Sequence, residues 1–111
     1  MAVANFDPIR SKAFGSITGS YTTLGTPLTT NTRIFKATNT TDAEMFLSLN
    51  GTTDHMFVPA GGFTLYDLST NSPPIAVTDN FVLALGTQFS IKYLSAPTLG
   101  AVYLETISSN L

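Results

Sequence analysis

The chain contains no cysteine and only one histidine among its 111 residues. Without cysteine it can form no disulfide, and it offers neither a thiolate metal ligand nor a thiol nucleophile. Structural and catalytic zinc sites take three or four ligands, usually several of them histidine or cysteine. We therefore expect no metal site and no cofactor.

Charge is also scarce, at 11% of residues against about 25% in typical domains. The five basic residues are scattered and the net charge is -2, so there is no basic stripe of the kind that nucleic-acid partners require. A low charge combined with ordinary hydrophobic content argues against disorder. It also predicts a polar surface that is easily desolvated, which suits a protein covered by neighbours, although threonine-rich strands account for part of the signal.

Long apolar runs are missing too. No window approaches 18 apolar residues, so we expect no membrane partner. The N-terminal segment MAVANFDPIR has no apolar core and contains Asp7, which argues against a signal peptide. The patterns Asn39-Thr40-Thr41 and Asn50-Gly51-Thr52 match glycosylation acceptors, but without a secretory route they are better interpreted as turns.

Helical periodicity is nearly absent, and glycine and proline interrupt the chain every eight to twelve residues, as in sandwiches and barrels. The clearest alternation of apolar and polar residues lies in Gln88–Tyr93. About eight short strands are expected, at Gly15–Thr23, Thr32–Thr38, Glu44–Leu49, His55–Val58, Phe63–Asp67, Asn80–Leu85, Gln88–Tyr93 and Ala101–Ile107. With no helix to cover a sheet, two sheets must cover each other. The fold class predicted is all-β: a two-sheet antiparallel β-sandwich, jelly-roll-like.

The domain organisation expected is an extended N-terminal arm, residues 1–13, followed by a single sandwich domain, residues 14–111. The arm is polar and contains Pro8 and one aromatic residue, Phe6. The segment Leu68 to Asp79 is longer than a hairpin needs and contains a Pro-Pro pair, so we expect it to cross between the sheets.

The stretch NGTTDHMFVPAGG, residues 50–62, holds the only histidine, with Asp54 directly before it. Asn-Gly after an alternating strand is a strong hairpin signal, and it places Asp54 and His55 at the mouth of the next strand. Adjacent strand residues point to opposite faces, so the two cannot chelate one ligand without a bulge. We interpret Asp54 and His55 as polar residues of a turn. The alternative is that they form a pH-sensitive contact at an interface.

No enzyme class is indicated. The chain has no Gly-x-Ser-x-Gly nucleophile elbow. Asp42 and Glu44 flank a turn, where acids are common, so they are a weak candidate for a glycosidase pair. The sequence GSITGS, residues 15–20, lacks the lysine that ends a phosphate loop and is interpreted as a glycine-interrupted strand. We expect a protein that is not an enzyme.

The sequence favours residues that contact a partner over catalytic residues. In the arm we expect Phe6, Pro8, Ile9, Arg10 and Lys12 to contact a partner, with the aromatic ring as anchor and the cations at the rim. On that hypothesis, deletion of residues 1–12 leaves thermal unfolding nearly unchanged. Ala101–Ile107, with Tyr103, is either a free edge that adds a strand from a second copy or an interior strand. A symmetric homo-oligomer, such as a homodimer, is expected.

The runs NTTDAEMFLSLNGTTDHMFVPAGGFTLYDL, residues 39–68, and GTQFSIKYLSAPTLGAVYLETI, residues 86–107, resemble small virion proteins of tailed bacteriophages. Size, composition and arm are similar to the capsid decoration, or staple, proteins of short-tailed phages. The resemblance implies a jelly-roll-like protein that binds the major capsid protein on the outer surface of the head after assembly in the host bacterial cytoplasm, and stabilises the capsid. It carries no site residue over.

Two other functions remain open. One is a head-to-tail connector or neck protein, which needs a heterologous interface that closes into a ring. The other is a carbohydrate-binding β-sandwich module, in which Tyr21, Tyr66 or Tyr103 stacks on a sugar beside convergent Asp or Asn.

Overall fold

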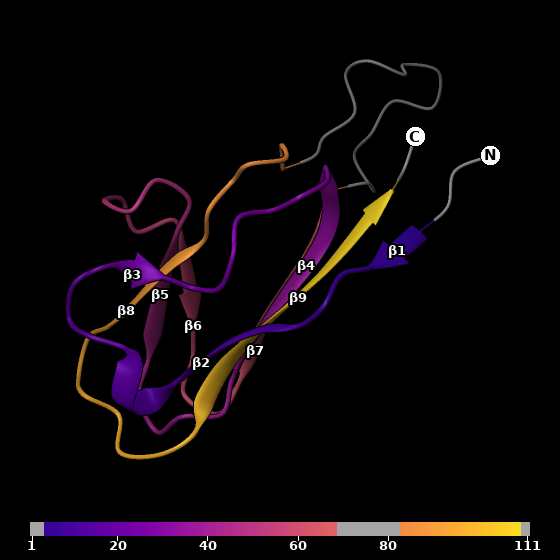
Figure 1. Ribbon diagram of the computed structural model, residues 1–111. Coiled ribbons are helices and arrows are strands. Elements are labelled where there is room, and N and C mark those ends of the chain that lie inside the picture. Colours follow the sequence, from indigo (N-terminus) through magenta and orange to yellow (C-terminus); the bar gives the residue numbers. More distant parts are fainter. Residues whose placement is uncertain (1–3, 69–82, 110–111) are drawn as a thin grey trace.

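The computed structural model describes residues 4–68 and 83–109, which form two antiparallel sheets packed face to face (Figure 1). The five-stranded sheet contains β1 (Ala4–Phe6), β2 (Arg10–Ala13), β4 (Thr32–Asn39), β7 (Phe63–Asp67) and β9 (Ala101–Ser109). The four-stranded sheet contains β3 (Thr22–Thr23), β5 (Met45–Ser48), β6 (Met56–Val58) and β8 (Ser90–Tyr93). The predicted all-β sandwich is confirmed.

The five-stranded sheet has the order β1-β9-β4-β7, and β2 also pairs with β9. The four-stranded sheet has the order β3-β8-β5-β6. Alternate residues of the strands point between the two sheets and form the core. They are joined there by Leu24 and Leu28 from the connection between β3 and β4. The largest fully buried apolar side chains are Phe89, Leu24, Leu28, Met45, Leu47, Ile91, Leu104, Val58 and Val102.

Strand boundaries differ most from prediction in the segment 15–23. A 3₁₀ turn, η1 (Phe14–Ser16), opens it, and only Thr22 and Thr23 pair as a strand. Thr18 Oγ1 donates to the carbonyl of Ser20 and accepts from the Ser20 N–H, so side-chain bonds replace part of a ladder. Elsewhere in the described part, Leu83 forms an isolated bridge with Thr32. Of the predicted crossing, Leu68 to Asp79, all but Leu68 lies outside the described residues.

The strand β9 lies in the interior of its sheet, so of the two alternatives for Ala101–Ile107 the interior strand is correct and the free edge is not. On one side β9 pairs with β4, and on the other with β2 and then β1. Figure 1 shows β9 between β4 and the N-terminal strands along its length. Residues 4–6 and 10–13 of the arm are therefore part of the sandwich.

Candidate functional site

Arg10 fastens the arm to the rest of the sandwich. Its side chain is 8% exposed. Nε donates to the carbonyl of Thr26 at 2.8 Å and Nη2 to that of Pro27 at 3.2 Å. Nη1 donates to Thr106 Oγ1 at 3.2 Å, and this hydroxyl donates to Asp7 Oδ2 at 2.9 Å. Arg10 is thus an internal tie and not the exposed rim cation that the sequence suggested.

The chain between β1 and β2 borders a hollow of about 400 Å³, which we call the Ile9 hollow. Its lining residues are Asp7, Pro8, Ile9, Arg10, Gly25, Thr26 and Thr29. Ile9 is 62% exposed beside it. Gly25 has φ +73°, and a Cβ there would lie 2.7 Å from Cβ and Cγ of Arg10. A glycine is therefore required at position 25 for the backbone there to pack against the aliphatic part of the Arg10 side chain.

The outer face of the five-stranded sheet carries a second exposed surface. Phe6 is 78% exposed, Phe63 58%, Leu65 56% and Tyr103 40%. They belong to β1, β7 and β9, and their register partners place them on one side of the sheet with the half-buried Ile34 and Ile107. We call these six residues the outer apolar face.

Three charged residues lie on the same side of the sheet as the outer apolar face: Asp67 beside Ile34, and the neighbouring Lys36 and Glu105. Lys36 and Glu105 are direct register partners on β4 and β9. The Lys36 ammonium lies 4.6 Å from the ring centroid of Phe63. Phe63 is on β7, which pairs with the edge of β4 opposite to β9. A hollow of about 140 Å³ opens between Lys36, Glu105, Phe6 and Leu65.

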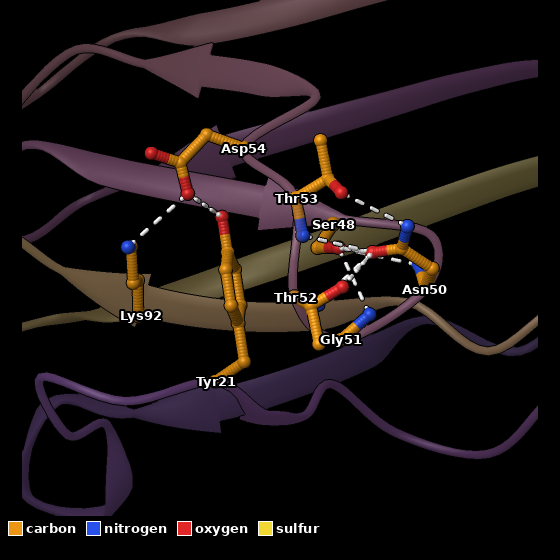
Figure 2. A network of polar contacts seen from close by, with 8 residues as sticks. All are labelled: Tyr21, Ser48, Asn50, Gly51, Thr52, Thr53, Asp54 and Lys92. Atoms are coloured by element: carbon orange, nitrogen blue, oxygen red, sulfur yellow. Dashed lines mark hydrogen bonds and ion pairs between the residues drawn. The ribbon is translucent and has the colours of Figure 1, made fainter.

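Asp54 belongs to a polar cluster on the outside of the four-stranded sheet (Figure 2). Tyr21 donates its hydroxyl to Asp54 Oδ1 at 2.5 Å, and Lys92 Nζ lies 3.1 Å from the same oxygen. Burial, and then the bond to Asp54, raise the pKa of Tyr21 well above its usual range. The Tyr21 and Lys92 bonds hold the pKa of Asp54 below its usual value. The Lys92 ammonium also lies 4.9 Å from the Tyr21 ring centroid.

The stretch NGTTDHMFVPAGG contains the loop of the hairpin formed by β5 and β6, and the polar side chain of Asn50 bonds within that loop. Asn50 Oδ1 accepts from the N–H groups of Thr52 and Thr53 and from Ser48 Oγ, as Figure 2 shows. His55 Nδ1 accepts from the Leu49 N–H at 3.0 Å. Asp54 and His55 therefore have different partners and do not converge on one ligand.

The remaining candidates have internal partners. Lys12 Nζ donates to the carbonyl of Thr23 at 2.8 Å. Asp42 accepts from the N–H and hydroxyl of Thr98, which lowers its pKa, and so it caps a loop. Tyr66 stacks on Phe35 with ring centroids 5.2 Å apart.

The sequence predicted contact roles for Phe6 and Tyr103 but not for Phe63 and Leu65, which lie on the same face of the sheet. The signal was present in the spacing of two between Phe63 and Leu65. It was obscured because Tyr66 is also apolar, so the pattern of Phe63–Asp67 does not say which side of the strand is covered.

Within residues 4–68 and 83–109 no group of three or more histidine and acidic side chains is arranged to hold a metal ion. No helix in that part of the chain is long and apolar enough to cross a bilayer. No family model matches the chain, and neither a curated protein nor a solved structure does so.

Proposed function

We propose that the chain is a non-enzymatic structural protein of a phage virion. In this role it binds the major capsid protein on the outside of the head and clamps neighbouring subunits. The proposal combines the sequence resemblance with a surface suited to rigid docking. The Ile9 hollow is the observation that carries it.

The Ile9 hollow has the features of an anchor point. Ile9 is exposed at its border, and the adjacent Pro8 restricts the backbone there. The residue after Ile9, Arg10, donates hydrogen bonds to three groups of the sandwich. An apolar side chain held in this way loses little conformational freedom when a partner covers it, which favours binding.

Low charge supports the same role. With 11% charged residues, contacts to a capsid subunit rest mainly on apolar and neutral polar groups. Such contacts are weakly screened by salt. Many modest contacts repeated over a capsid lattice stabilise it without tight single sites.

The test is co-sedimentation of the purified protein with phage heads that lack it, scored for saturation and for survival of the heads on heating. We expect saturation at many copies distributed over each head. Ile9→Ser should weaken binding about tenfold or more, since burying an isoleucine contributes about 1.5–3 kcal/mol. Leu99→Ser is the matched control, because Leu99 is 55% exposed but lies in the loop before β9.

Saturation at one ring of copies would replace the decoration role with the neck role. Failure of the wild-type protein to sediment with heads would overturn both. Equal binding by the Ile9 and Leu99 variants would remove the Ile9 hollow from the interface.

A further inference from the structure

We propose that the outer apolar face is the interface of a homodimer. In this dimer two copies pack their five-stranded sheets against each other about a two-fold axis. The axis runs parallel to β4 and β9 and midway between them. This inference concerns the protein alone and does not rest on the capsid proposal.

The outer apolar face leaves a large apolar area exposed. Aromatic side chains bury about 150–250 Å² each, so Phe6, Phe63 and Tyr103 at 78%, 58% and 40% exposure leave about 350 Å² open. Leu65 adds to this area at 56% exposure. A stable interface buries about 800 Å² per partner, with an apolar centre and a polar rim. The outer apolar face is of the size such a centre requires.

The positions of Lys36 and Glu105 define where the two-fold axis can lie. Lys36 and Glu105 lie side by side on adjacent strands, and adjacent strands are about 4.8 Å apart. A two-fold axis midway between the strands exchanges these two positions. It therefore places Lys36 of one protomer opposite Glu105 of its partner, and Glu105 opposite Lys36.

The charges also select this axis over the alternative. An axis perpendicular to the strands would place Lys36 opposite Lys36 and Glu105 opposite Glu105, and like charges at an interface cost several kcal/mol. The parallel axis gives two opposite-charge contacts in an isologous arrangement. Sheets stacked in this way have aligned strands, which is the common geometry of sheet-on-sheet packing.

The charged groups of Lys36 and Glu105 are both available to a second copy. Lys36 leans over Phe63, and Glu105 makes no hydrogen bond or ion pair with any residue that the structure describes. A carboxylate without a partner on an apolar face is costly to cover unless the covering surface supplies a cation. A second copy supplies Lys36 at that position.

The experiment measures mass by sedimentation equilibrium for the wild-type chain and two charge reversals, Lys36→Glu and Glu105→Lys. The wild type should be a dimer. Each reversal alone places like charges together twice, and should raise the dissociation constant about 100-fold. Mixing the two variants should restore dimers, because every contact in the mixed dimer again joins opposite charges. Thermal unfolding of each variant confirms that it folds.

A substitution pair tests the apolar part of the interface. Leu65→Ser should dissociate the dimer, whereas Ile9→Ser, at a site of similar exposure off this face, should not. A monomeric wild type, an assembly larger than a dimer, charge reversals that leave the mass unchanged, or variants that stay monomeric when mixed would each overturn the proposal. Dimerisation without head binding would refute only the capsid proposal.

Discussion

At the scale of single residues, two asparagines with the same sequence signature use their side-chain amide nitrogens differently. Asn39 is 1% exposed, and its Nδ2 donates to the carbonyls of Ala43 at 2.8 Å and Pro59 at 3.2 Å. At Asn50 it is the amide oxygen that collects most of the bonds. Asn39 Oδ1 also accepts from the N–H and hydroxyl of Thr41, so what distinguishes the two sites is the buried donor, which Asn39 supplies and Asn50 does not.

This difference predicts unequal costs for the same substitution. Asn39→Asp replaces a buried donor by a carboxylate facing carbonyl oxygens, and should lower the free energy of unfolding at pH 7 by about 3 kcal/mol or more. Asn50→Asp keeps the acceptor and should cost less than about 1 kcal/mol. Denaturant titration measures both. The Asn39→Asp deficit should shrink in acid, where the protonated carboxyl can donate; equal costs for the two variants at pH 7 would contradict the assignment.

Tyr21 makes the alkaline behaviour of the protein predictable. Its pKa is raised in the folded state, so below the unfolded value of 10.0 both states carry the proton. As the pH rises above 10.0 the unfolded tyrosine ionises first, and the stability that Tyr21 contributes is lost through the folded pKa. Part of the tyrosinate absorbance should therefore appear only well above pH 10.0, and Tyr21→Phe should abolish this late part.

The control for this titration is Tyr103→Phe, which removes a tyrosine on the other sheet. This variant should retain the late absorbance. If it disappears in Tyr103→Phe and persists in Tyr21→Phe, the bond between Tyr21 and Asp54 does not control the titration.

At the scale of elements, strands could be predicted wherever side-chain alternation decides the structure. Phe63–Asp67 was placed with its observed boundaries, and Thr32–Thr38 and Glu44–Leu49 came within two residues at each end. Pairing partners were not predictable, because a ladder joins backbone groups that are chemically the same in every strand. The arm shows this most clearly, since nothing in Arg10–Ala13 specifies β9 as its partner.

The candidate surfaces were predictable only in part for a related reason. The sequence singled out Phe6, Ile9 and Tyr103 as exposed, and all three are. It also treated Arg10 as exposed, because a cation next to a polar arm is usually solvated. The burial of Arg10 depends on the loop around Gly25 closing over it, which is a long-range packing event.

Gly100 holds the junction between β9 and the turn after β4. Its φ is +87°, and an added Cβ would lie 2.4 Å from the Thr40 carbonyl oxygen. Thr40 in turn exchanges hydrogen bonds with Ala101, at 2.9 Å. A side chain at this position must therefore push two backbone segments apart, so no local adjustment removes the conflict.

Gly100→Ala should consequently lower the free energy of unfolding by about 3 kcal/mol or more. Gly61→Ala is the control: its φ is +68° but nothing lies within 4 Å of the added Cβ. The left-handed conformation alone costs about 1–2 kcal/mol there. Chemical denaturation of both variants measures the difference, and equal effects would show that the close approach to Thr40 is relieved without cost.

At the scale of the whole molecule, the N-terminal strands β1 and β2 pair with the C-terminal strand β9 in the five-stranded sheet. β1 pairs antiparallel with β9 from Ala4 opposite Ser109 to Phe6 opposite Ile107, and β2 continues the ladder as far as Ala13 opposite Ala101. The N-terminal strands therefore cover the edge of β9 that would otherwise be open. This arrangement argues against the expectation that the arm can be removed without affecting the fold.

Deletion of residues 1–12 should lower the melting temperature by about 10 °C or more, since it removes two paired strands together with the buried ties of Arg10. It should also promote aggregation, because the newly exposed edge of β9 is a template for pairing with other chains. Deletion of residues 1–6 keeps Arg10 and should have a much smaller effect. Calorimetry and light scattering measure both, and a 1–12 deletion that melts with the full chain would show that the ladder to β9 contributes nothing. Because the larger deletion is expected to damage the fold, partner binding by the arm is tested by Ile9→Ser in the intact chain and not by truncation.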